Sequence, residues 1–295
     1  MALVDLPLHD FERASDLAGL CALLSERSAQ KAQTILLAGG TDWIVERHMA
    51  PPDGDGTTRP LVVDVSRLEE MRGISVADGT VTIGAATTYL EIRRHALLAT
   101  RAPLLGRMSK DVGAVQIQAR GTLGGNLATA SPAADGVAAL AALDATLILA
   151  STRGERRVAL GDFYTGYKRT VRADDELIRA VTFTLPRPGA VTYWRKVGTR
   201  AAQAISKVAL AGVAEITDGR LTRVGLGMAS VAPTTAFLPT VRTLALDTPV
   251  ATLTKEMLRG ATDDDIAPID DVRSTAAYRR HVARALVVEF FRTLA

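Results

Sequence analysis

Two short glycine-rich segments hold the residues best suited to bind a charged ligand. In the first, Gly39, Gly40, Thr41 and Asp42 follow the apolar run 35–37. Adjacent glycines can take positive φ and let the backbone approach a ligand closely. Successive N–H groups in such a turn form an anion-binding concavity, and Thr41 adds a hydroxyl donor. Because a glycine pair after a strand is more often a plain turn, this segment alone is a weak signal.

The second segment, residues 121–126, has three glycines within five residues, again with a threonine hydroxyl. Asn126 can both donate and accept hydrogen bonds. Downstream, the Asp135 carboxylate is well placed to bind ribose or ribityl hydroxyls; the alternative is an N-cap of a helix that includes Leu140. Neither segment contains a Walker motif or Gly-x-Gly-x-x-Gly. Two separate hydroxyl-bearing glycine loops suit a pyrophosphate held from both sides.

The composition leaves little room for other chemistry. The single cysteine, Cys21, can form neither an iron–sulfur cluster nor an internal disulfide, and the four histidines lack metal-ligand spacing. A net charge of +3 without long basic runs argues against nucleic-acid binding. No apolar stretch is long enough to span a bilayer, and residues 1–11 have no apolar signal core, so we expect a cytoplasmic protein. Redox chemistry would therefore need a bound organic cofactor.

The apolar patterning predicts a mixed α+β chain. A helical pattern begins at Ser15 and places Cys21 on its buried face. Thr88 and Glu91 have the spacing of a capping box, which predicts a helix over 89–99. Residues 50–60, with three prolines and two glycines, predict a flexible loop. The other expected elements are strands at 35–37, 61–63, 81–83, 143–149 and 177–185, a partner strand near Val158, and a helix at 104–115 that ends before a glycine-rich turn at 121–126.

A second domain is predicted after the Pro/Gly-rich segment 186–189. This divides the chain into 1–186, with subdomains of about 1–58 and 59–186, and 187–295. Asp218 and Gly219 predict a hairpin between 207–216 and 221–228. The last helical pattern buries apolar residues such as Phe290 and has residues facing away that include Arg279, Arg280 and Arg292. The regular strand–helix alternation of a Rossmann sheet is missing, as is any internal repeat.

Several motifs, in their order along the whole chain, closely resemble the FAD domain of molybdenum hydroxylases. Members of that family include the medium subunit of carbon monoxide dehydrogenase and the flavin part of xanthine dehydrogenase. The matching segments are 36–42, 83–88, 116–127 with Ser131, Pro132 and Asp135, 162–167, and 195–200. The resemblance implies an α+β fold in which a two-subdomain FAD domain of the vanillyl-alcohol-oxidase and para-cresol-methylhydroxylase type precedes a small α+β C-terminal domain.

The resemblance also implies which residues hold the cofactor. The two glycine segments would line the FAD phosphates and ribityl chain, and Asp135 would bind hydroxyl groups. Val112 stands where the xanthine dehydrogenase pattern has an aromatic residue. Ile178 would pack near the flavin, and Lys196 would lie near the cofactor. The full set is Leu36, Leu37, Ala38, Gly39, Gly40, Thr41, Asp42, Trp43, Val112, Thr122, Leu123, Gly124, Gly125, Asn126, Asp135, Ile178 and Lys196.

In function, the resemblance implies a flavoprotein subunit with no catalytic side chain of its own. It would bind FAD non-covalently, since no histidine or cysteine matches the flavin-linking positions of the wider fold. Its partners would be a large molybdopterin-binding subunit and a small 2Fe-2S subunit, in a dimer of heterotrimers. Electrons would pass from the clusters to FAD and on to NAD or another acceptor. The alternatives are a stand-alone FAD oxidoreductase of the same wider fold and a nucleotide-binding scaffold without turnover.

Overall fold

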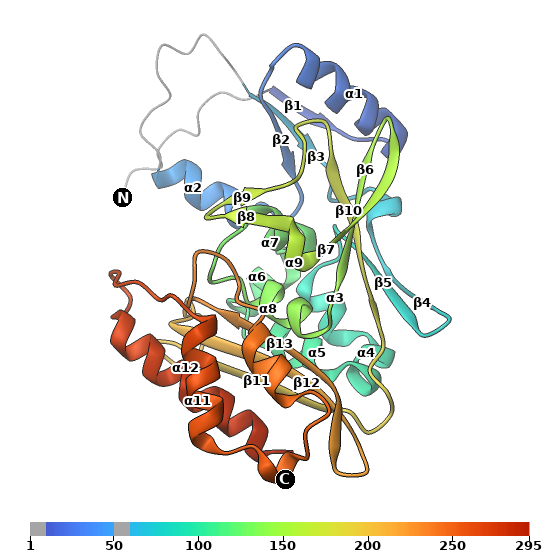
Figure 1. The fold of residues 1–295 in the computed structure, drawn as a ribbon. Coiled ribbons are helices and arrows are strands. Elements are labelled where there is room, and N and C mark those ends of the chain that lie inside the picture. The colour runs from blue at the N-terminus through green and yellow to red at the C-terminus, as the bar shows by residue number, and fades with distance from the viewer. Residues whose placement is uncertain (1–9, 50–59, 295) are drawn as a thin grey trace.

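The computed structural model describes residues 10–49 and 60–294. The expected loop at 50–60 therefore lies almost wholly outside the described residues, as does most of the N-terminal segment 1–11. No helix in the described ranges is both long enough and apolar enough to cross a membrane. The mixed α+β architecture expected from the sequence is confirmed (Figure 1).

A small parallel sheet forms the N-terminal part of the molecule. Its strand order is β1 (Asp10–Arg13), β3 (Leu61–Asp64), β2 (Thr34–Leu37). The sheet therefore extends past the subdomain boundary expected near residue 58. Helix α1 (Leu17–Ala29) precedes β2, and the short helix α2 (Trp43–Met49) follows the first glycine segment.

Helix α1 begins two residues later than its periodicity indicated. Asp16, not Ser15, is the N-cap, and its Oδ1 accepts a hydrogen bond of 2.7 Å from the amide of Gly19. A carboxylate at this position satisfies an amide that the first helical turn leaves unpaired. Cys21 lies on the buried face, 5% exposed, as predicted.

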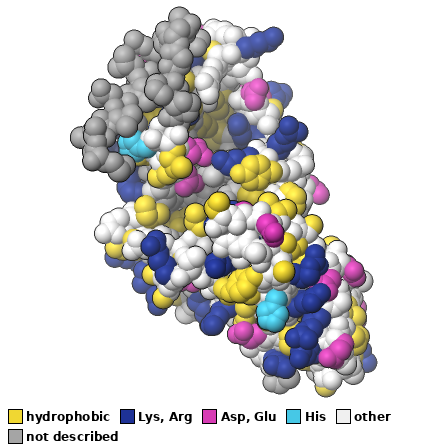
Figure 2. All heavy atoms as spheres, turned by 90° about the vertical axis from the view of Figure 1, so that its left-hand side faces the viewer, with side chains coloured by type: hydrophobic (Ala, Val, Ile, Leu, Met, Phe, Trp, Pro, Cys, Tyr) yellow, Lys and Arg dark blue, Asp and Glu magenta, His cyan; other side chains and the backbone are white. Residues whose placement is uncertain are grey.

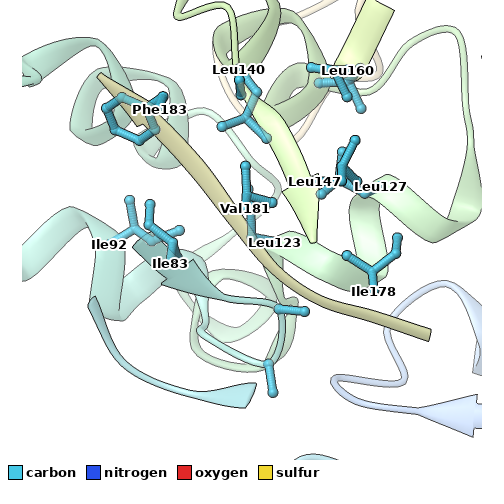
Figure 3. Close-up of a cluster of buried hydrophobic side chains, with 14 of the residues drawn as sticks. Ile83, Ile92, Leu123, Leu127, Leu140, Leu147, Leu160, Ile178, Val181 and Phe183 are labelled. Carbon is cyan, nitrogen blue, oxygen red and sulfur yellow. The ribbon is translucent and has the colours of Figure 1, made fainter. Parts of the chain in front are cut away.

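The second sheet is antiparallel and has five strands in the order β4-β5-β10-β6-β7. Its register aligns Ile83 of β5, Val181 of β10 and Leu147 of β6 in one row. Figure 3 shows this core, in which these side chains lie close to Leu123 and Leu140. The strands are β4 (Ile74–Ala77), β5 (Thr80–Gly84), β6 (Thr146–Ser151), β7 (Gly154–Ala159) and β10 (Leu177–Thr184), with a separate hairpin of β8 (Tyr164–Gly166) and β9 (Arg169–Thr170).

Seven helices, α3 to α9, lie between β5 and β8 along the described chain, and three expectations for this region need correction. The capping box at Thr88 is confirmed, but the helix stops at Arg94 because His95 takes an extended conformation and starts a new helix. The expected helix 104–115 ends at Lys110, and the turn expected at 121–126 contains a helix start. The helices are α3 (Tyr89–Arg94), α4 (Ala96–Arg101), α5 (Pro103–Lys110), α6 (Val115–Arg120), α7 (Leu123–Thr129), α8 (Asp135–Ala142) and α9 (Leu160–Phe163), with a 3-10 turn η1 (Glu69–Met71). Because α8 runs to Ala142, strand β6 starts at Thr146 rather than at 143.

The C-terminal sheet lies between α8 and the last helices. A Cβ on Gly225 or Gly227 would come within 2.0 or 2.1 Å of α8 carbonyl oxygens, so these glycines allow the close packing. On the other side, the Phe290 ring of α12 packs against Gly212. The predicted hairpin at Asp218 is confirmed. The elements are β11 (Val191–Val197), β12 (Val208–Thr217), β13 (Arg220–Ala229), α10 (Pro239–Ala245), η2 (Val250–Thr252), α11 (Lys255–Asp265) and α12 (Ala276–Arg292).

One expectation for the last helix was wrong. Arg279 does not face away but is buried, 3% exposed. Its guanidinium donates to the Ser230 carbonyl (3.1 Å) and to Asp271 Oδ1 (2.5 Å). Although burial opposes ionisation, hydrogen bonds from Arg279 and Arg273 lower the pKa of Asp271 well below its usual range. A helical period shows which residues share a face, but not that a carboxylate from another segment will pair with a buried arginine.

Figure 2 shows this side of the molecule, where lysine and arginine side chains gather over the C-terminal domain.

Candidate cofactor site

A cavity of ≈ 710 Å³ brings the two glycine segments together. This size is typical of a cofactor site. Its lining runs from the C-terminal end of α1 past both segments to Val112 and Ile117. The cavity contacts fourteen of the expected residues, namely Leu36, Leu37, Ala38, Gly39, Gly40, Thr41, Asp42, Trp43, Val112, Thr122, Gly124, Gly125, Asn126 and Ile178.

The first glycine segment offers unpaired amide groups to this cavity. Gly40 has φ +73°, which turns the chain sharply between β2 and α2. Within the described residues, the amides of Gly39, Gly40, Thr41 and Asp42 donate no hydrogen bond to the protein. Amides that line a cavity in this way need an acceptor. An anionic group such as a phosphate would satisfy several of them together.

The second glycine segment is built differently, because its amides are already used. Leu123 N donates to the Thr87 carbonyl (3.0 Å), and Gly124 N to the Ala85 carbonyl (2.8 Å). The Thr122 hydroxyl caps α7 by accepting from Gly125 N (3.1 Å). This segment therefore lines the cavity with side chains and with glycine backbone that a ligand can approach closely, rather than with free N–H donors. Leu123 belongs to this segment, but its side chain is fully buried in the hydrophobic core and does not line the cavity.

The two segments touch each other directly. A Cβ on Gly39 would lie 2.1 Å from the Arg120 carbonyl oxygen and 3.0 Å from the Gly121 Cα. The Thr129 hydroxyl also donates to Asp42 Oδ2 at 2.8 Å, which links α7 to the first segment. The cavity wall is thus a joint between the segment that follows β2 and the helices α6 and α7.

We predict that Thr129→Val weakens this joint. The variant keeps the shape of the side chain but removes the donor to Asp42, which should lower the free energy of unfolding by about 1 kcal/mol and weaken cofactor binding by a similar amount. Chemical denaturation and a cofactor titration would measure both effects. Thr100→Val, an exposed threonine that bonds only within its own helix, is the control. Equal behaviour of the two variants would contradict a role for the Thr129 hydroxyl in the joint.

Two buried polar atoms at the cavity have no partner among the described residues, namely Tyr89 Oη and Asn126 Oδ1. Both lie against Gly136, where a Cβ would be 2.4 Å from the hydroxyl and 2.6 Å from the amide oxygen. Burial raises the pKa of Tyr89 well above its usual value, so its hydroxyl stays protonated and can donate. Buried unpaired atoms of this kind are uncommon. The free amides of the first segment fit a ligand that carries phosphate groups.

Asp135 and Lys196 lie elsewhere, since neither lines the cavity. They form a buried ion pair of 2.5 Å between the start of α8 and β11. Asp135 also accepts from Ser206 Oγ at 2.7 Å, and Lys196 donates to the Asp111 carbonyl at 3.0 Å. Burial raises the pKa of the Asp135 carboxyl, and the Lys196 ammonium opposes this shift. Asp135 is the first residue of α8 but makes no capping bond. A direct role of either residue at the cofactor remains a prediction.

Several residues of the cavity could not be recognised from the sequence. Tyr89 lies within the capping box, directly after Thr88, and no sequence pattern marked it as a cavity residue. Other missed lining residues come from the end of α1 and the loop before β10, where the sequence pattern had no signal for a ligand. They include Arg27, Ser28, Lys31, Arg172 and Asp174.

Comparison with known proteins agrees with this geometry. Residues 8–188 match the family model "FAD binding domain in molybdopterin dehydrogenase", and residues 193–294 match "CO dehydrogenase flavoprotein C-terminal domain". The chain is 28% identical to the xanthine dehydrogenase FAD-binding subunit of Escherichia coli O157:H7, over 94% of this chain and 92% of the relative. It is 35% identical to the nicotinate dehydrogenase FAD-subunit of Eubacterium barkeri, over 59% of this chain and 58% of the relative.

The fold comparison gives the same result. A chain in the structure of reconstituted CO dehydrogenase from Oligotropha carboxidovorans superimposes with a TM-score of 0.88 and 26% identity, covering 98% of this chain and 99% of that chain. The fold and the site define an FAD-binding protein. The chain belongs to the molybdenum hydroxylase family, as the FAD-binding subunit of an oxidoreductase.

Proposed function

We propose that this chain takes electrons from the 2Fe-2S clusters of a partner subunit and passes them to NAD or another acceptor. It would do so in a complex with a small 2Fe-2S subunit and a large molybdopterin-binding subunit, arranged as a dimer of heterotrimers. The observation that carries the proposal is the cavity between the two glycine segments, with free amides from one and a tightly packed backbone from the other.

The cysteine count supports electron entry from another chain. With one cysteine in 295 residues, which is buried in α1, the chain cannot ligate an iron–sulfur cluster. The structural relatives include CO dehydrogenases, one of them a Cu,Mo enzyme. In such a complex the metal chemistry belongs to other subunits, and this chain provides the flavin site.

The residues of this chain would bind and orient the cofactor. FAD, when bound, supplies the ability to take up two electrons and release them. The amides of Gly39 to Asp42 would hold its phosphates. Val112 and Ile178 would form an apolar part of the cavity wall and exclude water from the cofactor. None of these steps needs a nucleophile or a general base from the protein.

The experiment that tests this proposal is purification of the complex through a tag on this chain from its native host. We expect molybdenum and iron to copurify in constant ratio with FAD, and substrate addition to bleach the flavin absorbance. A single-chain flavoprotein that oxidises its own substrate at full rate would instead establish the stand-alone oxidoreductase. A flavin that no substrate or reductant bleaches in the complex would favour the scaffold.

A further inference from the structure

The short loop between α5 and α6, residues 111–114, carries part of the wall of the cofactor cavity, and we call it the wall loop. Val112 lines the cavity from this loop, and Ile117 lines it from the first turn of α6. Gly113 has φ +54°, and a Cβ there would lie 2.8 Å from the Ile117 Cβ. Because the loop packs so closely on the helix, a displacement of the loop would change the wall at both apolar side chains.

The C-terminal domain holds the wall loop at its first residue, Asp111. Trp194 Nε1 donates to Asp111 Oδ2 at 2.8 Å, and Lys196 Nζ donates to the Asp111 carbonyl oxygen at 3.0 Å. That carbonyl belongs to the peptide bond that joins Asp111 to Val112, so the bond from Lys196 fixes the peptide plane next to Val112. The two donors are two positions apart on β11, which lies beside α5 (Figure 1), and therefore share a face of the strand.

Both contacts to Asp111 are sheltered from water. Trp194 is partly buried and packs against the main core and against the small cluster of Ala138, Ala209 and Ala229. The Lys196 side chain is 11% exposed. Hydrogen bonds in such surroundings are electrostatically stronger than those at the surface. Among the described residues, the wall loop makes no other hydrogen bond to the C-terminal domain.

We infer that Trp194 is a positioning residue for the cofactor, which acts through Asp111 to hold Val112 against the bound flavin. The inference rests on the proposed role of this cavity as the FAD site. No described residue of the C-terminal domain lines the cavity, so the domain acts on the cofactor through the wall loop. The isoalloxazine ring is the flat, largely apolar part of FAD, and an apolar wall suits it. The bond from Trp194 sets how closely this wall fits the ring.

The test measures FAD binding to the apoprotein of the full chain in two variants that remove the same hydrogen bond. Trp194→Phe keeps an aromatic ring but loses the donor. Asp111→Ala loses the acceptor at a partly buried position, so it carries the test if the tryptophan variant misfolds. Each variant should raise the dissociation constant for FAD at least about threefold. The bound flavin should also lose the fine structure of its visible absorbance band, because water reaches the ring.

Two further variants separate positioning from general packing. Arg107→Met is the matched control, because Arg107 donates to the Thr192 carbonyl at 3.0 Å and so also joins α5 to β11, but lies outside the wall loop and the cavity lining. It should bind FAD like the wild type, with the same absorbance band. Asp111→Asn keeps an acceptor oxygen for Trp194 and should bind FAD more tightly than Asp111→Ala.

The double variant Trp194→Phe with Asp111→Ala should bind FAD no more weakly than the weaker single variant, since both changes remove one bond. Additive losses would overturn the inference. So would wild-type affinity and absorbance in the two folded single variants, an equal loss in Arg107→Met, or an Asp111→Asn protein as weak as Asp111→Ala. Failure of the proposed function is distinguishable, because the wild-type chain itself would then bind no FAD.

Discussion

Replacing Gly39 by alanine should leave a folded chain that binds FAD at least tenfold more weakly, a loss of about 1.4 kcal/mol or more. The new Cβ would lie 2.1 Å from the Arg120 carbonyl oxygen, a backbone atom that cannot rotate away. The two glycine segments must therefore separate. Because residues 39–42 line the cavity with unpaired amides, a shift of the first segment would disturb the phosphate cradle. Flavin content per chain, with circular dichroism as the folding check, measures the effect.

Gly106→Ala is the control for this variant. Gly106 lies within α5, and a Cβ there meets no atom within 4 Å. Alanine should stabilise the helix by about 0.5–1 kcal/mol and leave the flavin content unchanged. A Gly39→Ala protein that binds FAD like the wild type would show that close contact between the segments is not required.

Lys196→Met should lower the free energy of unfolding by about 3–5 kcal/mol, because it leaves the buried Asp135 carboxylate without its cation. The two side chains are 11% and 9% exposed, so water cannot replace the lost partner. Denaturant unfolding followed by fluorescence would measure the change, since Trp194 bonds to Asp111 at 2.8 Å beside the pair.

The double variant Lys196→Met with Asp135→Leu separates a structural role from a cofactor role. Replacing both members of a buried pair by apolar groups is often nearly neutral, so most of the lost stability should return. Full flavin content in the double variant would assign the pair to packing between the two domains. A stable double variant without FAD would instead support the direct cofactor role that the family resemblance implies. A single variant as stable as the wild type would contradict the buried ion pair.

Local patterns predicted the elements well where the signal was local. The capping box at Thr88 and the hairpin at Asp218 needed only neighbouring residues, and both are present. The glycine segments were recognised from their unusual composition, and both were expected to bind phosphate. The sequence did not show that the amides of the first segment are free while those of the second donate within the protein. Only the fold shows that Gly124 donates to Ala85, and that a Cβ there would lie 2.5 Å from the Ala85 Cβ. A bulky residue at Gly124 should therefore disturb core packing as well as the cofactor.

Long-range pairing accounts for what the sequence did not reveal. Arg279 was placed on the outer face because helical periodicity does not contain its partner Asp271. Lys196 meets Asp135, which lies 61 positions earlier in the chain.

The cavity between the glycine segments should hold one FAD without a covalent bond. Neither cysteine nor histidine occurs among its described lining residues. The most direct test is acid precipitation of the purified protein, followed by identification of the released flavin by mass and by absorbance. We expect FAD in the supernatant, one per chain. Flavin that stays with the pellet, or a mononucleotide in place of FAD, would contradict it.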